Sequence, residues 1–447
     1  MATALIILGA GMGTRMNSDL PKVLHEIAGA PMLVHAMKSG AALAPAKTVV
    51  VAGHGAALVE KSAKAYDPDV IVAIQSDQLG TAHAVSQAGD ALAGFEGDAL
   101  VLYGDTPFIR PETLAAMRAA RLTHDVVVLG FETAHPGRYG RLIMKDDQLD
   151  RIVEFKDTTD EERAVTLCNS GVITTDSAVM FDLISAVGKE NAAGEYYLTD
   201  IIGIARTRGL TATVVVCDES ETLGINSRAE LSDAEALFQE RARTAAQADG
   251  VTLTAPRTVF FAHDTVIGRD AVIEPNVVFG PGVTVESGAT IRAFSHLEGC
   301  HVSRGAVVGP YARLRPGAEL AENVKVGNFV EIKNAQVAEG AKVNHLSYIG
   351  DASIGARSNI GAGTITCNYD GVFKHKTTIG EDVFIGSNTM LVAPITVGDA
   401  AMTGSGSVVT KNVPAGDLAV GRAKQENKAG FALRLFEKLK ARKAKGS

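Results

Sequence analysis

The chain has 447 residues, more than the roughly 250 to 300 at which a single core stops growing, so we expect two domains. Its 43 Lys and Arg against 51 Asp and Glu give a net charge of -8, which excludes a general attraction to nucleic acid or anionic lipid. No apolar run approaches the roughly 20 residues that cross a bilayer, and the 4 cysteines stand singly without disulfide or metal spacing. We therefore expect a cytoplasmic protein with free thiols that acts on small molecules.

The first part of the chain, residues 1–226, alternates short apolar runs with helical segments. Such alternation is typical of an α/β domain whose strands are buried on both faces. The opening run carries no basic segment and leads into a glycine cluster, so it predicts a buried strand rather than an export signal. The predicted strands lie at residues 4–8, 48–52, 99–103 and 126–131.

Residues 227–249 lack glycine and place apolar side chains at three- and four-residue spacing, as in Leu231, Ala234, Leu237 and Phe238. This spacing puts the apolar side chains on one face of an α-helix. The segment is predicted to be a helix that connects the first domain to the second.

Residues 250–425 repeat with a period of six. Each hexad is expected to form a short strand and a turn, and stacked coils then bury a continuous aliphatic column that no single coil could bury. The pattern predicts a parallel β-helix. The predicted inward residues are Ile267, Ile273, Phe279, Val285, Ile291, Leu297, Val302, Val308, Leu314, Leu320, Val326, Ile332, Ile379, Ile385, Leu391, Val397, Thr403 and Val409.

Two segments depart from this repeat. Residues 366–376 interrupt the hexads and are expected to loop out of the coil, and insertions in solenoids often carry binding residues. Residues 426–447 form a basic tail, whose end from Lys438 onward is expected to be frayed and solvated.

The first predicted strand runs into a turn that contains Gly9, Gly11 and Gly13. A glycine-rich turn between strand and helix lets backbone N–H groups approach phosphate oxygens, although such a turn can also be purely structural. A dinucleotide-binding turn would need a third glycine at position 14, where the chain has Thr14. The P-loop pattern is also missing here, so a different phosphate-binding motif is expected.

Residues 11–22 resemble the G-x-G-T-R-M-x-x-x-x-P-K motif of the sugar nucleotidyltransferases. The resemblance implies that Arg15 and Lys22 stabilise the transferring phosphate, although Met12 departs from the cation common at its position. It also implies that Gln75, Gly80 and Thr81 lie near the uracil, and that Gly140, Glu154 and Asn169 lie near the sugar. The remaining residues expected to contact UTP or the nucleotide sugar are Leu8, Gly9, Ala10, Gly11, Tyr103, Gly104, Asp105 and Asn226.

Asp105 follows the predicted strand 99–103, where the carboxyl ends of parallel strands bind ligands. A lone aspartate there is more often a helix cap or a turn residue. The resemblance implies that Asp105 and Asn226 instead bind Mg²⁺, which accepts a few protein oxygens and keeps waters and substrate phosphates as its other ligands.

The second half carries its own candidate residues. Arg315 and Lys333 are cations on a solenoid built mainly of small and aliphatic residues, so they are suited to a substrate phosphate, although solvated surface charges are the simpler interpretation. His345 could take a proton from a substrate ammonium, although a single histidine is more often structural.

Long strings around these residues, such as 313–318, 328–333, 344–348 and 361–371, resemble one family. Its members are hexapeptide-repeat acyltransferases joined to a uridylyltransferase, which make UDP-N-acetylglucosamine for bacterial-type cell-envelope polymers. The resemblance implies a left-handed β-helix, a homotrimer with the acetyl site between β-helices, and His345 as the catalytic base. It places Arg315, Lys333, Tyr348 and Asn359 at the sugar phosphate, and Ala362, Asn368, Tyr369, Ser387, Ser405 and Arg422 at acetyl-CoA. Ser405 stands where a relative can carry alanine.

The resemblance therefore implies two activities: acetyl transfer from acetyl-CoA to glucosamine 1-phosphate, and then uridylyl transfer from UTP to N-acetylglucosamine 1-phosphate with release of pyrophosphate. One alternative is a sugar nucleotidyltransferase of single activity whose β-helix is structural or regulatory. The presence of Lys333, His345 and the loop with Asn368 and Tyr369 argues against it. A nicotinamide-dependent oxidoreductase is disfavoured by the glycine spacing. Neither nucleic acid nor membrane insertion is expected.

Overall fold

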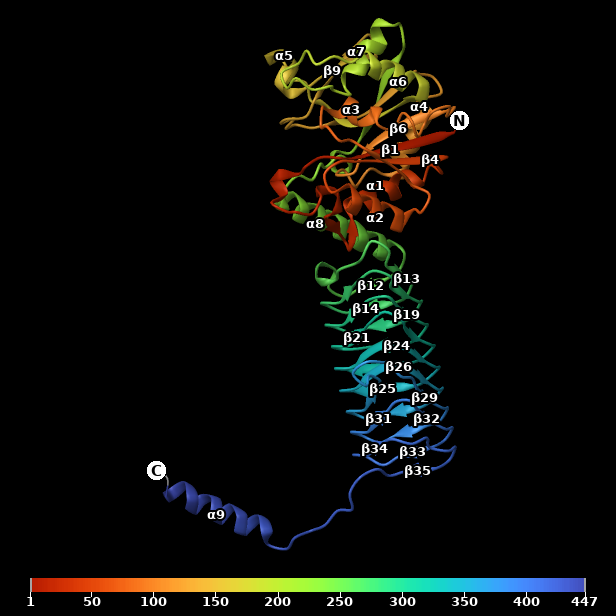
Figure 1. Ribbon diagram of the computed structural model, residues 1–447, viewed down its shortest axis with the longest axis vertical. Helices are drawn as coiled ribbons and strands as arrows, with labels where there is room; N and C mark the ends of the chain where they lie inside the picture. Colours follow the sequence, from red (N-terminus) through yellow and green to blue (C-terminus); the bar gives the residue numbers. More distant parts are fainter. Residues whose placement is uncertain (1, 446–447) are drawn as a thin grey trace. The chain divides into compact units, whose positions relative to one another are not determined.

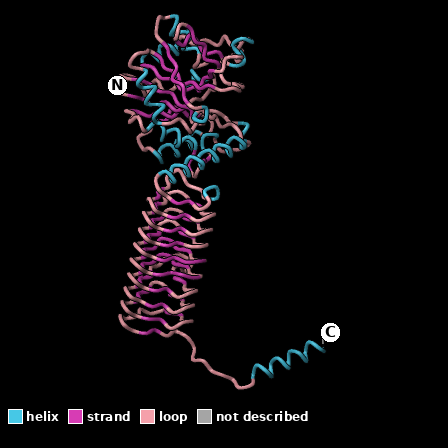
Figure 2. The backbone as a smooth tube through the Cα atoms, turned by 180° about the vertical axis from the view of Figure 1, so that it is seen from behind, coloured by secondary structure: helices cyan, strands magenta, loops and turns pink. Residues whose placement is uncertain are grey.

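The structure is a computed structural model that describes residues 2–445. The chain divides into two compact units, Met1–Ala242 and Arg243–Ser447. The first is an α/β unit and the second is dominated by short parallel strands (Figures 1 and 2). No helix in residues 2–445 is long and apolar enough to cross a membrane.

A twisted sheet with strand order β11-β7-β10-β6-β1-β4-β5 forms the centre of the first unit. Its strands are parallel except β10, which runs antiparallel to β6 and β7, and the β8–β9 hairpin joins it through β10. The four strands predicted from the sequence are confirmed as β1, β4, β6 and β7. The strands are β1 Thr3–Gly9, β4 Lys47–Ala52, β5 Ile71–Ile74, β6 Asp98–Tyr103, β7 Val126–Glu132, β8 Arg141–Lys145, β9 Gln148–Val153, β10 Leu167–Asp176 and β11 Ala212–Cys217, and β2 Glu26–Ile27 pairs separately with β3 Ala30–Pro31.

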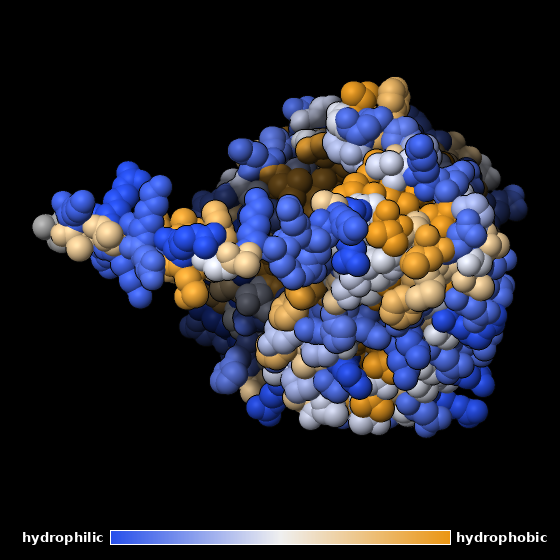
Figure 3. Space-filling model, turned by 90° about the horizontal axis from the view of Figure 1, so that it is seen from below, coloured by the Kyte–Doolittle hydropathy of each residue, from blue (hydrophilic) through white to orange (hydrophobic). Residues whose placement is uncertain are grey.

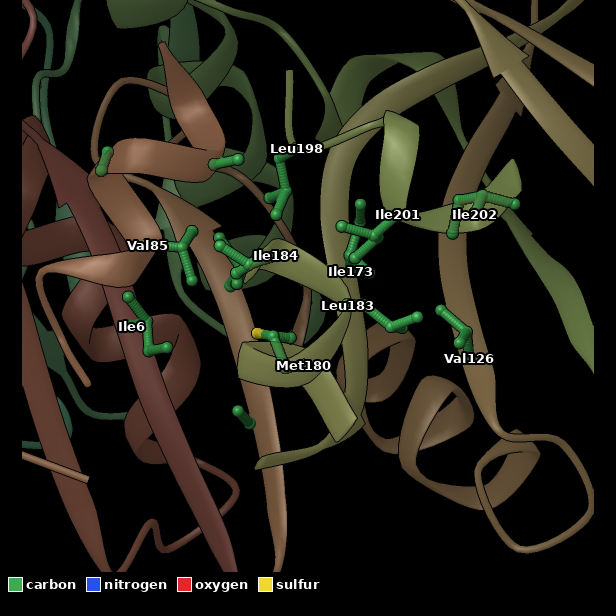
Figure 4. Close-up of a cluster of buried hydrophobic side chains, with 14 of the residues drawn as sticks. Ile6, Val85, Val126, Ile173, Met180, Leu183, Ile184, Leu198, Ile201 and Ile202 are labelled. Atoms are coloured by element: carbon green, nitrogen blue, oxygen red, sulfur yellow. The ribbon is translucent and has the colours of Figure 1, made fainter. Parts of the chain in front are cut away.

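Helices cover both faces of this sheet. The side chains of β1 therefore alternate between two different cores. Ile6 packs with Met180, Leu183 and Ile201 on one face (Figure 4), and Leu5 belongs to the core on the other. All seven residues of β1 are buried, as expected for a strand between two helical layers. The helices are α1 Met32–Ala41, α2 Ala56–Tyr66, α3 Thr81–Ser86, α4 Pro111–Ala120, α5 Asp160–Arg163, α6 Ser177–Ser185, α7 Asp200–Thr207 and α8 Arg228–Ala248.

Helix α8 occupies the segment in which the sequence predicts a connecting helix, and the division between the two units falls within it. Its apolar face packs on the first unit, where Ala234, Leu231, Leu237 and Phe238 join a small core around Ile225. The start of this helix therefore belongs structurally to the first unit.

The second unit is a left-handed parallel β-helix of hexapeptide repeats. One flat face is the ladder β12-β14-β17-β20-β23-β25-β27-β30-β33-β35. Its strands are β12 Thr252–Leu253, β14 Val272–Ile273, β17 Thr290–Ile291, β20 Val307–Val308, β23 Lys325–Asn328, β25 Lys342–His345, β27 Asn359–Ile360, β30 Phe384–Ile385, β33 Met402–Thr403 and β35 Leu418–Ala419. The other strands are β13 Val266–Ile267, β15 Val278–Phe279, β16 Thr284–Val285, β18 His296–Leu297, β19 Cys300–Val302, β21 Arg313–Leu314, β22 Ala318–Leu320, β24 Glu331–Val337, β26 Tyr348–Ile354, β28 Ile365–Cys367, β29 Thr377–Ile379, β31 Met390–Val392, β32 Ile395–Val397 and β34 Val408–Val409.

The predicted inward residues form the core of this β-helix. All of them are buried except Ile267 near its first coil, which is half-buried. Thr403 is polar, yet it occupies an inward position. Its hydroxyl has a hydrogen-bond partner there, because it accepts from the backbone N–H of Gly386 at 2.9 Å.

The break in the repeat is shorter than the sequence suggests. Thr366 and Cys367 were expected to loop out, but they lie in strand β28, and Thr366 is fully buried. Its hydroxyl donates to the Gly350 carbonyl at 3.0 Å, which lets a polar side chain occupy an inward position. The segment that leaves the coil is residues 368–376, which we call the expelled loop.

The basic C-terminal segment is also more ordered than expected, because residues from Phe431 to Lys445 form helix α9. This part of the chain is rich in Leu, Ala, Lys and Arg, which favour helices, and it has no glycine after Gly430 until position 446. Its side chains are exposed, as are the outward Val408, Leu418 and Val420 near the end of the β-helix. Figure 3 shows apolar residues among hydrophilic ones on the face seen from below.

Candidate functional sites

A pocket of about 300 Å³ opens at the carboxyl ends of the first unit's strands. The glycine-rich turn after β1 forms one wall and the turn before α3 forms another. Gly80, at the start of α3, has φ of 122°, and a Cβ there would lie 2.4 Å from the Tyr196 carbonyl, so only glycine fits this turn. The predicted nucleotide residues that line the pocket are Leu8, Gly9, Ala10, Gly11, Lys22, Gln75, Gly80, Thr81, Tyr103 and Asp105.

Lys22, Asp105 and Asn226 converge at this pocket. The Lys22 ammonium donates to the carboxylate of Asp105, and it donates to Oδ1 of Asn226 at 3.0 Å. Lys22 and Asp105 are largely buried, with side-chain exposures of 12% and 19%. Oxygen atoms of both predicted metal ligands therefore face a single positive group.

Backbone contacts hold these two oxygen ligands together. The Ile225 N–H donates to the Asp105 carbonyl at 3.0 Å, which fixes Asn226 beside the end of β6. The Gly104 N–H donates to the Leu8 carbonyl at 2.9 Å, which fixes Asp105 beside the glycine-rich turn. In residues 2–445 there is no group of three or more His, Cys, Asp or Glu side chains that could enclose a metal. The donor set thus suits an ion that takes most of its ligands from substrate and water, as Mg²⁺ does.

Arg15 lies on the one-turn 3-10 helix Thr14–Met16, and its side chain is exposed and does not line the pocket. The turn is anchored by Met16, which is only 1% exposed. Arg15 is therefore carried by a fixed turn while its own side chain remains free of the core.

The three residues predicted at the sugar form their own cluster. A Cβ at Gly140 would lie 3.5 Å from a Glu154 carboxylate oxygen and 3.6 Å from the Asn169 side chain. Glu154 accepts a hydrogen bond from the Thr199 hydroxyl at 3.1 Å, and burial raises its pKa above the usual value of 4.5. Burial, with Glu154 and Asp105 nearby, also raises the pKa of Tyr103, so this side chain remains a neutral phenol between the two clusters.

Two polar residues of the pocket were missed from the sequence. Gln78 donates to the Ala10 carbonyl at 2.7 Å and so ties the glycine-rich turn to the segment before α3. Glu195 lines the pocket from the segment before α7. Gln78 lies inside the stretch from Gln75 to Gly80 that carried the resemblance, whereas nothing in the sequence singles out Glu195.

In the β-helix, one group of predicted acetyl-site residues lies on an edge that we call the lysine edge, formed by residues 315–317, 333–334 and 350–351 with the expelled loop. Arg315 pairs with Glu331 at 2.7 Å. Lys374 of the expelled loop contacts Lys333 and, with Arg315, lowers the pKa of Lys333. Three cations therefore gather here, which favours an anion such as a phosphate.

Tyr348 and Asn368 meet at this edge too. A Cβ at Gly350 would lie 2.5 Å from the Tyr348 hydroxyl and 2.8 Å from the Asn368 amide nitrogen, so only glycine lets both side chains approach. The Asn368 amide also donates to Asp351. Tyr369, next in the expelled loop, is 60% exposed and donates to the Gly371 carbonyl.

His345 lies on a different edge, which we call the histidine edge. Backbone hydrogen bonds stack its coils: Gly363 N to His345 O at 3.2 Å, Asn388 N to Ala362 O at 2.7 Å and Gly406 N to Ser387 O at 2.8 Å. The Arg422 side chain approaches the same edge at Gly406. The residues concerned are His345, Ala362, Ser387, Ser405 and Arg422, and Asn359 lies on strand β27 just before Ala362.

His345 Nδ1 lies 2.8 Å from Oδ1 of Asn328, its neighbour in the preceding coil. Because an amide oxygen only accepts, this contact assigns the ring proton to Nδ1 and leaves a lone pair on the exposed Nε2. The predicted acetyl-site residues are thus distributed over two edges of the β-helix. The candidate base lies on the histidine edge and the cations lie on the lysine edge.

Models of known families match both units. The MobA-like NTP transferase domain matches residues 5–167, the bacterial transferase hexapeptide (six repeats) matches residues 264–299, and the GMPPB C-terminal domain matches residues 297–396. The matches place a nucleotidyltransferase unit before a hexapeptide-repeat unit.

Relatives match over the full length. A bifunctional protein GlmU from Roseobacter denitrificans is 67% identical over 100% of this chain and 99% of its own length. One from Ruegeria pomeroyi is 69% identical over 99% of each chain. A crystal structure of UDP-glucose pyrophosphorylase complexed with UDP-glucose covers 54% of this chain and 100% of its own, with 18% identity and a TM-score of 0.44.

Proposed function

The chain belongs to the family of bifunctional GlmU proteins, and from this membership and the geometry of its two units we propose how it makes UDP-N-acetylglucosamine. It is a bifunctional transferase. The hexapeptide-repeat unit acetylates glucosamine 1-phosphate with acetyl-CoA, and the nucleotidyltransferase unit transfers uridylyl from UTP to N-acetylglucosamine 1-phosphate with release of pyrophosphate.

The contact of Lys22 with both Asp105 and Asn226 is the observation that carries our assignment of the uridylyl site. The triphosphate lies against the glycine-rich turn, with uracil toward Gln75 and Thr81. A phosphate oxygen of the sugar 1-phosphate attacks the α-phosphate of UTP, the new P–O bond forms, and the bond to the leaving pyrophosphate breaks. Lys22 and Arg15 stabilise the negative charge that develops on the transferring phosphate.

Asp105 and Asn226 are the residues that would hold Mg²⁺. Their oxygens already face one cation, and that fit supports a divalent ion in place of the Lys22 contact. When bound, the ion neutralises phosphate charge during the displacement. In the substrate-bound state Lys22 would contact the triphosphate, while Asp105 and Asn226 would hold the ion.

In acetyl transfer, His345 acts as the general base. Asn328 holds Nδ1–H, so Nε2 accepts a proton from the substrate ammonium. The freed amine attacks the thioester carbonyl of acetyl-CoA, the N–C bond forms, and coenzyme A leaves as its thiol. Arg315, Lys333, Tyr348 and Asn359 hold the sugar phosphate, and Ala362, Asn368, Tyr369, Ser387, Ser405 and Arg422 contact acetyl-CoA.

A homotrimer explains why these residues are divided between two edges, because the histidine edge of one β-helix can face the lysine edge of its neighbour. An exposed aromatic column supports self-association: Phe294, Tyr311 and Phe329 stack in successive coils at centroid distances of 4.9 and 5.2 Å while remaining 52, 47 and 56% exposed. Apolar surface of this kind marks interaction sites. We also place the enzyme in the cytoplasm, where its four free cysteines would remain reduced.

One mixing experiment tests the function. Glucosamine 1-phosphate, acetyl-CoA, UTP and Mg²⁺ are supplied together, and UDP-N-acetylglucosamine, coenzyme A and pyrophosphate are expected. Leaving out acetyl-CoA should stop product formation, and N-acetylglucosamine 1-phosphate should restore it. A chain that uses N-acetylglucosamine 1-phosphate but never releases coenzyme A from glucosamine 1-phosphate would carry only the nucleotidyltransferase activity.

A further inference from the structure

Arg228, the first residue of α8, contacts two turns of the segment after β1, at Met16 and at His25, which lie more than 200 residues earlier. Its Nε donates to the Met16 carbonyl at 3.2 Å, and its Nη1 lies 3.2 Å from Nδ1 of His25. A guanidinium has several donors in a fixed planar fork, so it can hold two acceptors at once.

These two acceptors flank the candidate catalytic cations. Met16 directly follows Arg15 and is buried at the end of the turn Thr14–Met16. His25 closes the turn Lys22–Leu24, because its N–H donates to the Lys22 carbonyl at 3.2 Å. Arg228 therefore ties the turn that carries Arg15 to the turn that begins with Lys22.

His25 is suited to accept this contact. It is only 4% exposed, and burial together with the Arg228 charge lowers its pKa, so the ring is neutral with Nδ1 as the acceptor. Its Nε2 has no hydrogen-bond partner among residues 2–445. The Arg228 contact is thus the polar interaction that orients this buried ring, and the ring in turn orients the end of the Lys22 turn.

The first turn of α8 also holds the candidate metal ligand Asn226. The Glu230 carboxylate accepts from the Asn226 N–H at 2.6 Å, and the Ile225 N–H joins the Asp105 carbonyl. The first turn of α8 thereby contacts the Arg15 turn, the Lys22 turn and the Asn226 segment.

We propose that Arg228 is a positioning residue for uridylyl transfer, which fixes the Arg15 and Lys22 turns relative to each other and to Asn226; this rests on the catalytic roles proposed above for Arg15 and Lys22. Without the guanidinium, the two turns remain bonded within themselves but lose their common anchor. The cations then spend less time in the geometry that the α-phosphate requires, and misplacement by about 1 Å can cost about 10²-fold in rate.

The test is a double-mutant cycle on the full-length protein with Arg228→Met and Arg15→Ala. Arg228→Met should lower kcat/KM for UTP by about 10- to 100-fold and leave the KM for N-acetylglucosamine 1-phosphate within about twofold. Arg15→Ala should cost far less in the Arg228→Met background than in the wild type, because residues that act as a unit are not additive. Acetyl transfer by the same chain should remain unchanged.

Arg241→Met is the matched control. Arg241 lies on the same helix, but it donates to the Ser220 hydroxyl at 2.8 Å and lies over the Phe108 ring, so it contacts other segments than Arg228 does. It should reproduce any general loss of stability without the loss in kcat/KM for UTP. His25→Phe removes the other partner of this contact and should reproduce the effect of Arg228→Met. It replaces Arg228→Met in the test if that variant does not fold.

Additive effects of Arg228→Met and Arg15→Ala, or normal kcat/KM for UTP in both Arg228→Met and His25→Phe, would overturn the positioning role. An inert Arg15→Ala substitution in an otherwise normal enzyme would instead contradict the catalytic role proposed for Arg15. The cycle therefore separates a failure of this inference from a failure of the site on which it rests.

Discussion

The ammonium of Lys22 lies 3.0 Å from the amide oxygen of Asn226 and also contacts the carboxylate of Asp105, although these residues are 204 and 83 positions away in the chain. A single positive group therefore occupies the place where the two proposed metal ligands meet. The fold therefore brings to one point the two oxygen groups that would hold Mg²⁺ and the cation that we propose contacts the triphosphate.

Replacing Asp105 by alanine should lower uridylyl transfer by at least about 10²-fold while acetyl transfer stays near normal, because the Asn226 amide alone is a weak partner for Mg²⁺. Steady-state rates of both reactions on the same preparation give the comparison. Asn226→Ala should act in the same direction. Wild-type UTP turnover in a folded Asp105→Ala protein would reduce Asp105 to a turn residue.

His345→Ala should lower acetyl transfer by about 10² to 10⁴, the usual contribution of general-base catalysis. The substrate is an ammonium at neutral pH, and without a base few molecules carry the lone pair that attacks the thioester. Asn328→Ala should cause a smaller loss, since it only frees the orientation of the ring. The variant must still bind acetyl-CoA and uridylylate; if such a protein acetylates normally, the base lies elsewhere.

A fragment of residues 1–249 should uridylylate without acetylating. Residues up to Ala242 form a compact unit with cores on both faces of their sheet, and α8 packs its start against them. Circular dichroism would show whether the fragment folds, and pyrophosphate release would report activity. A folded fragment that releases no pyrophosphate would show that the second unit is needed for the first reaction.

Tyr311→Arg should abolish the proposed trimer and with it acetyl transfer, because a charge would enter the stacked column between Phe294 and Phe329. Sedimentation velocity gives the oligomeric state. Uridylyl transfer should persist, since its residues belong to one unit. Lys325→Ala, on an outward position of the first ladder, is the surface control. A trimeric Tyr311→Arg protein would place the interface on another face.

Glu154→Gln should raise the melting temperature, and increasingly so as the pH rises above 4.5. Burial raises the pKa of Glu154, so the native state binds more protons than the unfolded state in this range, and wild-type stability falls as the carboxyl ionises. Glutamine removes that cost. The same variant should bind N-acetylglucosamine 1-phosphate more weakly. Equal melting temperatures for the two proteins at pH 8 would contradict the burial argument.

The sequence alone determined the order and kind of the elements, because both depend on local patterns. Continuous apolar runs predicted β1, β4, β6 and β7, and the hexads predicted the inward column of the β-helix almost residue by residue, since the side-chain period of each is fixed by backbone geometry. The predicted pocket residues came from the resemblance of the motifs to those of the sugar nucleotidyltransferases. The sequence could not show where the expelled loop begins. Thr366 is polar, and only the structure shows that its hydroxyl donates to a carbonyl inside the β-helix, which allows it an inward position.

Only the tertiary structure decided which distant side chains meet. The contacts of Lys22 with Asn226, of Arg228 with Met16 and of Lys333 with Lys374 depend on how turns from separate elements end beside one another, and no local pattern encodes that. The separation of His345 from Lys333 onto two edges follows likewise from the phase of each residue around the coil. Local periodicity fixes the coil, whereas long-range packing fixes what gathers at its edges and at the ends of the sheet.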